Sequence, residues 1–353
     1  MSDRLHVLVT FALEPELTEQ IRAVDPARIE VELLGQDQRR LLRGFKYPSE
    51  REREAVAEGL HGAFERADVV FGFWGAELHA ALAGGTGAPR ALREVAPRLR
   101  WIQLTSAGAD RLLGSGYIEE GVVVTTASGL HATPIGEFVL SAILMFAKRA
   151  PGSLRAQIRH EWARFAPSEL RGATVGIVGL GHIGAEVGRL AKAFGCRVIA
   201  TTRSATEQHS RPEADDVLPA GELHTLLAEA DYVVLSMPLT PATRGMIGEA
   251  ELRAMKQTAV LINIARGPVV VEAALIRALR EGWIAGAALD VFEREPLPQD
   301  SPLWDMENVI VTPHISGGTE IYNQRAVAIL TGNIRRFLAG EPLVNVVDPA
   351  RGY

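Results

Sequence analysis

Three side chains in the C-terminal half of the chain are of the kinds that transfer a proton and bind an acid. His314 follows the apolar run 309–312, and an imidazole that titrates near neutral pH can exchange a proton with a substrate hydroxyl. Glu295 precedes it, and a carboxylate beside an imidazole orients the ring and favours its protonated form. Arg266 comes just after a mostly apolar run, and its planar guanidinium suits a carboxylate. These segments also allow a structural ion pair for Arg266 and an ordinary surface position for His314.

A glycine-rich turn in the middle of the chain has the pattern of a dinucleotide-binding site. Residues 174–184, Thr-Val-Gly-Ile-Val-Gly-Leu-Gly-His-Ile-Gly, combine a buried strand, a turn and the start of a helix. Gly179 permits the tight turn, Gly181 lets a pyrophosphate approach the backbone, and Gly184 lets helix and strand pack closely. The first helical amides would then face the anion. The alternative is a glycine turn that binds no ligand.

The end of the next expected strand, 197–202, bears on the choice of dinucleotide. An acid at this point usually accepts hydrogen bonds from the adenosine ribose hydroxyls. Here the chain has Thr202, Arg203 and Ser204 instead. A guanidinium flanked by hydroxyls can bind a 2′-phosphate, which a carboxylate would repel. The sequence therefore favours NADP, while NAD remains possible if Arg203 is only a solvated surface residue.

The elements that must position these residues alternate between strand and helix. This alternation predicts an α/β fold built on doubly wound parallel sheets, with ligands bound beyond the carboxyl ends of the strands. Residues 207–219 are polar and are predicted to form a loop. Strands are predicted at 5–11, 29–34, 69–73, 101–105, 122–126, 175–179, 197–202, 232–236, 259–264, 284–289 and 308–312. Helices are predicted at 14–24, 49–67, 134–149, 183–194, 220–229, 249–255, 271–281 and 319–338, with Pro151-Gly152 ending the apolar helix 134–149.

Composition narrows the class of protein. The chain has 353 residues, enough for two domains, and a formal net charge of −6 without a long basic block, so nucleic acid and anionic membranes are not expected partners. No apolar run reaches the ~20 residues of a membrane helix, and the N-terminus lacks a signal-peptide pattern. The single cysteine, Cys196, excludes an intrachain disulfide. These features together predict a cytoplasmic protein.

Five sequence blocks, taken in order, resemble the D-isomer-specific 2-hydroxyacid dehydrogenase family. They are Gly-Leu-Gly-His-Ile-Gly at 179–184, Met-Pro-Leu-Thr-Pro-Ala-Thr at 237–243, Asn-Ile-Ala-Arg-Gly at 263–267, Asp-Val-Phe-Glu-Arg-Glu-Pro at 290–296 and Thr-Pro-His at 312–314. The resemblance implies a Rossmann coenzyme domain, 109–312, inserted into a flavodoxin-like substrate domain made of 1–108 and 313–353. It also implies an active site between the domains and a homodimer, with the helix 134–149 as a dimer element. The segment 158–167 could be an arm that crosses to the partner.

The resemblance also implies roles for individual residues. Arg266 would bind the substrate carboxylate and polarise the keto oxygen, His314 would exchange the proton, and Glu295 would pair with His314. Asp290 would bind the nicotinamide carboxamide. No metal is implied. The other expected cofactor contacts are His182, Ile183, Met237, Pro238, Thr243 and Ile264, and the backbone amides around Ser106, Ala107 and Gly108 would hold the other side of the substrate carboxylate.

The expected function is hydride transfer between NADP(H), or NAD(H), and a small 2-keto or D-2-hydroxy acid. Glyoxylate, hydroxypyruvate, pyruvate and bulkier 2-keto acids all fit the motifs. Two other functions on the same fold stay open: a nucleotide-sensing binding protein similar to the C-terminal-binding-protein corepressors, and a dehydrogenase of formate or phosphite.

Overall fold

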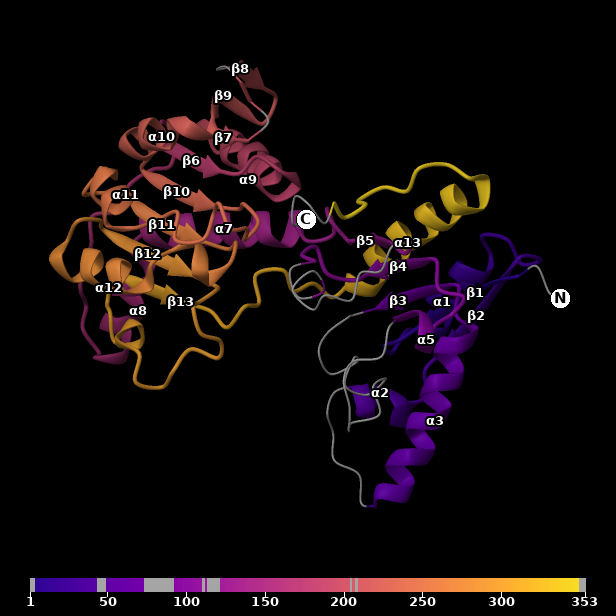
Figure 1. Ribbon diagram of the computed structural model, residues 1–353. Coiled ribbons are helices and arrows are strands. Elements are labelled where there is room, and N and C mark those ends of the chain that lie inside the picture. The colour runs from indigo at the N-terminus through magenta and orange to yellow at the C-terminus, as the bar shows by residue number, and fades with distance from the viewer. Residues whose placement is uncertain are drawn as a thin grey trace. The chain divides into compact units, whose positions relative to one another are not determined.

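The computed structural model describes residues 4–42, 49–72, 92–109, 112, 121–203, 205–206 and 209–348. The chain forms two compact units, each with its own sheet (Figure 1). Unit 1 consists of residues 1–130 and 320–353, and unit 2 consists of residues 131–319. The first unit is therefore discontinuous in sequence.

Unit 1 contains a five-stranded parallel sheet with the order β2-β1-β3-β4-β5, which is the flavodoxin-like order expected from the family resemblance. Helices cover both faces because alternate strand residues point to opposite sides: Val7 and Val9 pack toward α1 and α13, while Leu8 packs toward α3. The strands are β1 (Leu5–Val9), β2 (Ile29–Leu33), β3 (Val69–Gly72), β4 (Trp101–Leu104) and β5 (Val123–Thr125). The helices are α1 (Pro15–Arg22), α2 (Gln36–Leu42), α3 (Glu50–Arg66), α5 (Leu92–Val95) and α13 (Tyr322–Ala339).

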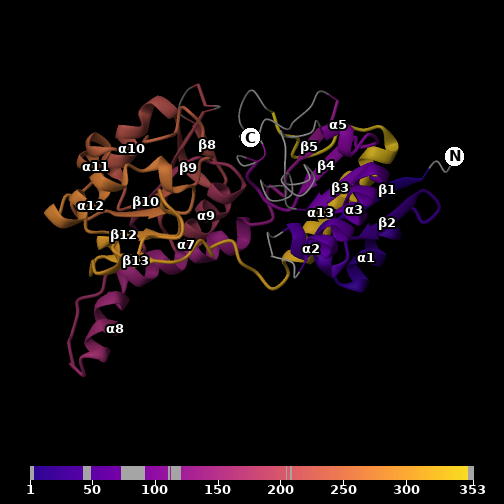
Figure 2. The ribbon, with the colours of Figure 1, turned by 60° about the horizontal axis from the view of Figure 1, so that its bottom comes forward.

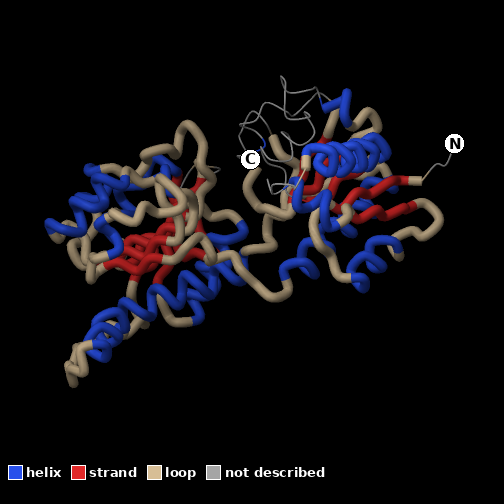
Figure 3. Tube along the Cα trace, turned by 90° about the horizontal axis from the view of Figure 1, so that it is seen from below, coloured by secondary structure: helices blue, strands red, loops and turns tan. Residues whose placement is uncertain are grey.

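Unit 2 contains an eight-stranded sheet with the order β13-β12-β11-β10-β6-β7-β9-β8, parallel except for β8. One face packs against α7 and α9 and the other against α10, α11 and α12, so the sheet lies between two helical layers (Figures 2 and 3). The strands are β6 (Thr174–Val178), β7 (Arg197–Thr202), β8 (His209–Arg211), β9 (Ala214–Pro219), β10 (Tyr232–Leu235), β11 (Val260–Asn263), β12 (Gly286–Leu289) and β13 (Val309–Val311). The helices are α7 (Ala132–Ala147), α8 (Ala150–Ile158), α9 (His182–Ala193), α10 (Leu223–Glu229), α11 (Glu249–Ala254) and α12 (Glu272–Glu281), with short 3-10 turns at Ala220–Glu222, Gly267–Val269 and Pro302–Trp304.

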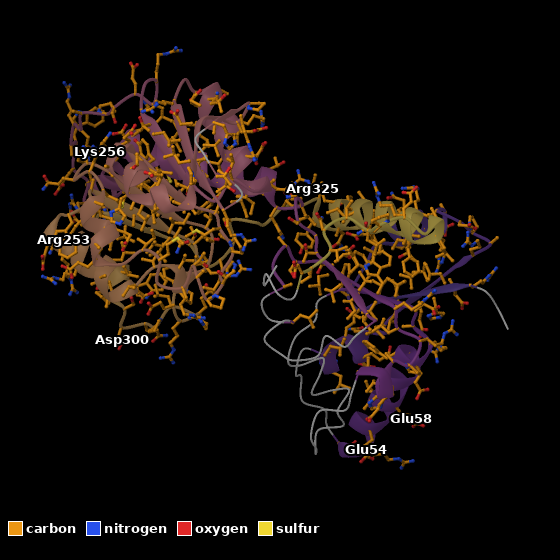
Figure 4. The ribbon with its side chains drawn as sticks, turned by 45° about the horizontal axis from the view of Figure 1, so that its top comes forward. Glu54, Glu58, Arg253, Lys256, Asp300 and Arg325 are labelled. Carbon is orange, nitrogen blue, oxygen red and sulfur yellow. The ribbon has the colours of Figure 1, made fainter. Side chains whose placement is uncertain are left out.

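Many charged side chains of both units are exposed on the outside of the helices and loops. In Figure 4 the side chains of Glu54 and Glu58 in unit 1, and of Arg253 and Asp300 in unit 2, point away from the ribbon, in line with their exposure. No helix in the described part of the chain has the length and apolarity to span a membrane.

The prediction of a loop at residues 207–219 is wrong. Residues 209–219 of this segment form the β8–β9 hairpin, and β9 extends the sheet beside β7. Two acids made β9 look polar, yet their carboxylates lie on basic side chains: Asp215 contacts Lys192 at 2.7 Å, and Asp216 contacts Arg197 at 2.8 Å. Paired charges of this kind are compatible with a strand near a sheet edge.

The apolar helix also ends differently from the prediction. Helix α7 stops at Ala147, and Arg149 adopts a left-handed conformation with φ 58°. Pro151 then lies in the first turn of α8, where its fixed φ and missing N–H are tolerated. Pro151-Gly152 therefore begins a second helix and does not terminate the first.

The two junctions between the units lie later in the chain than the expected boundaries at 108/109 and 312/313. Strand β5 pairs with β4, which keeps the chain up to residue 130 in unit 1. Residues 313–319 stay in unit 2 because the turn after β13 bonds to it: His314 N–H donates to the Asp290 carbonyl at 2.9 Å, and the Gly317 carbonyl lies 3.1 Å from His131 Nδ1. His314 therefore belongs to unit 2.

Candidate active site

The expected cofactor and catalytic residues of unit 2 follow the carboxyl ends of its parallel strands. The glycine turn follows β6, Arg266 follows β11, Asp290 and Glu295 follow β12, and His314 follows β13. Strands β11, β12 and β13 are immediate neighbours, at the usual spacing of about 4.8 Å. The fold thus places the proposed catalytic side chains on adjoining strand ends.

The glycine turn has the steric features that a dinucleotide requires. A Cβ at Gly179, where φ is +99°, would lie 2.9 Å from the backbone nitrogen of Met237, and a Cβ at Gly184 would lie 2.2 Å from the Gly179 carbonyl oxygen. A Cβ at Gly181 would meet nothing within 4 Å, so this is the glycine at which a ligand can come close to the backbone. The Ser236 hydroxyl donates to the Gly179 carbonyl at 2.7 Å and fixes the turn to the end of β10. These residues fit a nicotinamide dinucleotide.

The remaining expected cofactor residues follow the carboxyl ends of β6, β10 and β11. His182 is exposed at the first position of α9, Ile183 is half-buried behind it, and Ile264 is buried after β11. In the segment 237–243 the Thr243 hydroxyl donates to the Pro238 carbonyl at 2.7 Å, so it braces that loop.

At the end of β7, Thr202 is half-buried and Arg203 is exposed. Ser204, the third expected contact there, lies outside the described residues. The described part of this strand end therefore presents a hydroxyl and a guanidinium and no acid, as the cofactor argument requires.

His314 and Glu295 form the expected pair. His314 Nδ1 lies 2.8 Å from Glu295 Oε2, and both side chains are partly exposed. The Phe292 N–H donates to Glu295 Oε1 at 3.2 Å, which orients the carboxylate. With Nδ1 engaged by the carboxylate, Nε2 is the ring nitrogen through which a proton can reach a substrate.

Arg266 lies on a braced turn. The Asn263 side chain is buried; its Nδ2 donates to the Arg266 carbonyl at 3.2 Å and its Oδ1 accepts from the Ala265 N–H at 3.1 Å. A Cβ at Gly267 would lie 1.8 Å from both the carbonyl carbon and the oxygen of Phe292. The Arg266 turn is thus packed, backbone on backbone, against the loop that carries Glu295.

Asp290 is a buried hydrogen-bond acceptor. It is 1% exposed, and its carboxylate accepts hydrogen bonds from residues of the turn that carries His314. The expected contact with a nicotinamide carboxamide was the only role that the sequence suggested for it. The bonds to the His314 turn could not be seen in the sequence, although Thr312 directly precedes the Pro-His pair.

The expected substrate loop lies in unit 1, after β4. The Ser106 hydroxyl donates to the Gly108 carbonyl at 2.8 Å, and the Ser106 carbonyl accepts from the Ala127 N–H at 2.9 Å; Ala107 is half-buried between them. Tyr322 at the start of α13 donates its hydroxyl to the Thr105 carbonyl at 2.6 Å, directly before this loop. Sequence reasoning missed Tyr322, because nothing in its local pattern connects it with a residue more than two hundred positions away.

No group of three or more histidine, cysteine, aspartate or glutamate side chains in the described ranges could hold a metal ion.

Comparisons with known proteins agree with this architecture. The family model "D-isomer specific 2-hydroxyacid dehydrogenase, NAD binding domain" matches residues 140–316. The glyoxylate reductase of Korarchaeum cryptofilum is 37% identical over 261 residues, which cover 72% of this chain and 78% of that protein.

Two crystal structures are similar over almost the whole chain. The D-isomer specific 2-hydroxyacid dehydrogenase of Xanthobacter autotrophicus Py2, in complex with NADPH and MES, superposes with a TM-score of 0.77 at 31% identity, covering 99% of this chain and 100% of that one. The NADPH-dependent glyoxylate/hydroxypyruvate reductase of Sinorhizobium meliloti, in complex with NADP and sulfate, gives a TM-score of 0.76 at 29% identity with the same coverage.

Proposed function

Because this chain belongs to the D-isomer-specific 2-hydroxyacid dehydrogenase family, we propose that it reduces small 2-keto acids, such as glyoxylate or hydroxypyruvate, to D-2-hydroxy acids with NADPH. The class of the reaction, hydride transfer between a nicotinamide dinucleotide and a 2-hydroxy acid, follows from the family. The substrate and the preference for NADPH are the proposed parts. The observation that carries the proposal is the His314–Glu295 pair at 2.8 Å, which joins the segments that follow β13 and β12. Arg266 follows β11, the next strand of the sheet.

When bound, the nicotinamide would supply the hydride that the keto carbon accepts. Arg266 binds the substrate carboxylate and polarises the keto oxygen. His314, protonated and held by Glu295 at Nδ1, gives a proton from Nε2 to that oxygen. In the reverse direction Nε2 takes the proton from the hydroxyl. The protein's contribution is the orientation of the two reactants and the placement of charge.

The dinucleotide would bind along the carboxyl ends of the same strands. Gly179, Gly181 and Gly184 would receive the pyrophosphate at the start of α9, and Arg203 with Thr202 would receive the 2′-phosphate. The open space beyond Gly181 and the exposed guanidinium after β7 support this assignment. The relatives solved with NADPH and NADP support the same preference.

Steady-state kinetics with NADPH and NADH against a panel of 2-keto acids test the proposed function. We expect turnover of glyoxylate or hydroxypyruvate, and a loss of roughly two to four decades in kcat for His314→Ala, the usual weight of a positioned acid–base group. The matched control is His224→Ala, whose imidazole is exposed on α10 and pairs with Glu251 at 3.3 Å. Tight dinucleotide binding with no turnover on any keto acid would contradict the proposal and favour a nucleotide-sensing role. If only formate or phosphite is oxidised, the substrate is not a 2-keto acid, and the proposed substrate class is wrong.

The cofactor preference has its own test. Arg203→Ala should raise the KM for NADPH by roughly 10- to 100-fold, the effect of losing a charge-assisted hydrogen bond, and change the KM for NADH little. Equal small changes with both cofactors would remove Arg203 from the phosphate site.

We also assign the protein a homodimeric state, with α8 and the segment after it as the contact. This segment, the α8 arm (150–169), exposes a run of large apolar side chains, among which Trp162 is 92% exposed and Ile158 is 80% exposed. Phe165 packs on Gly152, because a Cβ added at this glycine would lie 3.1 Å from the ring. The two ends of the arm therefore contact each other, while Trp162 between them stays exposed. Light scattering should show a dimer that Trp162→Ala weakens and that Trp304→Ala, on a half-exposed tryptophan of the same unit, does not. A wild-type monomer at micromolar concentration would refute this assignment.

A further inference from the structure

The buried carboxylate of Asp290 directs all of its described hydrogen bonds to the turn that carries His314. Oδ1 accepts from the Thr312 hydroxyl at 2.6 Å and from the Ile315 N–H at 2.9 Å, and Oδ2 accepts from the Ser316 N–H at 2.9 Å. The Asp290 carbonyl accepts from the His314 N–H, also at 2.9 Å. Both the backbone and the side chain of one residue thus hold the segment 312–316 on each side of the candidate proton donor.

The conformation of His314 explains why its turn needs this support. Its φ is +54°, in the left-handed region that few residues with a Cβ adopt. The N–H groups on both sides of that conformation are the ones that bond to Asp290. Hydrogen bonds to a carboxylate are stronger than those to a neutral acceptor, and burial strengthens them further. Asp290 thus bonds to the turn on both sides of its left-handed residue.

We propose that Asp290 and Thr312 form a positioning pair, which fixes the turn of His314 and thereby the 2.8 Å contact of His314 with Glu295. The inference rests on the proposed function, because it gives a role to residues that act through His314. An ionised carboxylate has about four acceptor positions, of which three are occupied here. The positioning role therefore does not use up the acceptor capacity of the carboxylate. The Thr312 hydroxyl donates to Asp290, while the Thr312 carbonyl accepts from the His314 N–H at 3.1 Å, a backbone bond that a side-chain substitution leaves in place. Removing the hydroxyl therefore separates the positioning role of Asp290 from its expected cofactor contact.

The test compares Thr312→Val with Thr312→Ser. Valine keeps the shape of threonine and removes the hydroxyl, whereas serine keeps the hydroxyl that donates to Asp290. With NADPH and the best keto acid of the panel, we expect Thr312→Val to lower kcat by roughly tenfold or more, since a shift of about 1 Å in a catalytic group can cost about 10²-fold. We expect its activity to decline at lower pH than that of the wild type, because a loosened His314–Glu295 contact favours the protonated ring less. The affinity for NADPH, measured by its fluorescence, should change less than about twofold, and Thr312→Ser should restore both kcat and the pH profile.

A second readout does not require activity. The imidazole signal of His314, assigned in the NMR spectrum by its absence from His314→Ala, should titrate at lower pH in Thr312→Val than in the wild type and in Thr312→Ser. This result would support the positioning pair even if no keto acid of the panel is reduced, so the failure of the proposed function can be told apart from the failure of this inference.

Two results would overturn the inference. If Thr312→Val only lowers the melting temperature and leaves kcat, the pH profile and the imidazole titration as in the wild type, the hydroxyl has a structural role alone. If it weakens NADPH binding with an unchanged pH profile and imidazole titration, Thr312 and Asp290 serve the cofactor and not His314.

Discussion

The close approach of Gly267 to Phe292 allows a sharp test of how the site is assembled. In Gly267→Ala the new Cβ would lie 1.8 Å from the carbonyl carbon and oxygen of Phe292 and 2.4 Å from the backbone nitrogen of Glu293. Ordinary contacts of a Cβ begin at 3.4 Å. The two backbone segments must therefore separate by roughly 1.6 Å, because neither obstacle is the end of a flexible side chain that could turn away.

This separation affects three proposed catalytic groups together. The displaced loop carries the Phe292 N–H that orients Glu295, and Glu295 in turn holds His314 at 2.8 Å. The other side of the contact is the turn that presents Arg266. Since a misplacement of about 1 Å can cost about 10²-fold in rate, we expect kcat/KM to fall by at least about 10²-fold. Overpacking should also lower the free energy of unfolding by about 1–3 kcal/mol.

The assay is kcat/KM for the best 2-keto acid with NADPH, together with NADPH affinity and thermal unfolding. We expect NADPH to bind with nearly wild-type affinity, because the glycine turn after β6 lies on a different strand end. The matched control is Gly221→Ala, where a Cβ meets nothing within 4 Å and the backbone is not in the left-handed region. A folded Gly267→Ala protein with at least half of the wild-type kcat/KM would refute the argument that this backbone contact sets the geometry of the site.

Three further substitutions probe neighbouring parts of the structure. Glu295→Gln should make the reduction activity decline at lower pH than in the wild type, because a neutral amide no longer favours the protonated ring of His314; an unchanged pH profile would argue against the pairing. Burial first, and then the charge of a neighbouring glutamate, raises the pKa of Glu272 at the start of α12. A carboxyl whose pKa is higher in the folded than in the unfolded state contributes stability at low pH and loses that contribution as the pH rises through the folded value. Glu272→Gln should therefore raise the melting temperature at pH 7 and have little effect near pH 4, and equal effects at both would contradict the sign. Tyr322→Phe removes the 2.6 Å hydrogen bond to the Thr105 carbonyl, so it should raise the KM for the keto acid several-fold while NADPH affinity stays constant; an unchanged KM would show that the hydroxyl does not position the loop after β4.

The sequence predicted the strands and helices well where burial alone determines them. The expected strand 197–202 coincides with β7, and β6, β10 and β11 begin and end within one residue of their predicted bounds. Strands buried on both faces of a parallel sheet appear as apolar runs between glycine turns and polar loops, which is a local signal. The sequence did not predict β9 because Asp215 and Asp216 make it look polar, whereas both are paired with Lys192 and Arg197, which lie elsewhere in the sequence.

The residues of the candidate site could likewise be predicted from local sequence, whereas the contacts that hold them could not. Residue types at strand ends are visible in a sequence, and so Glu295 and His314 could be paired before the fold was known. The bonds that hold them are tertiary: Thr312 with Asp290, the Phe292 N–H with Glu295, and Tyr322 with Thr105. Each joins residues whose separation along the chain gives no periodic signal. The units of the structure also differ from the expected domain boundaries for a tertiary reason, since the pairing of β5 with β4 keeps the chain up to residue 130 in unit 1.

The order of the strands in unit 2 places the residue proposed to select NADPH far from the residue proposed to transfer the proton. Arg203 follows β7 and His314 follows β13, and five strand spacings of about 4.8 Å place these strand ends roughly 24 Å apart. Glu295, in contrast, touches His314 directly. Substitutions more than about 7–10 Å apart without shared partners usually add within about 0.5 kcal/mol, whereas residues in contact do not. Arg203→Ala and His314→Ala should therefore have additive effects on the free energy of activation from kcat/KM with NADPH, while Glu295→Gln should cost little once His314 is alanine. Non-additivity between Arg203 and His314 would mean that binding of the 2′-phosphate changes the position of the reacting groups. That result would contradict the independence expected from the distance between these strand ends.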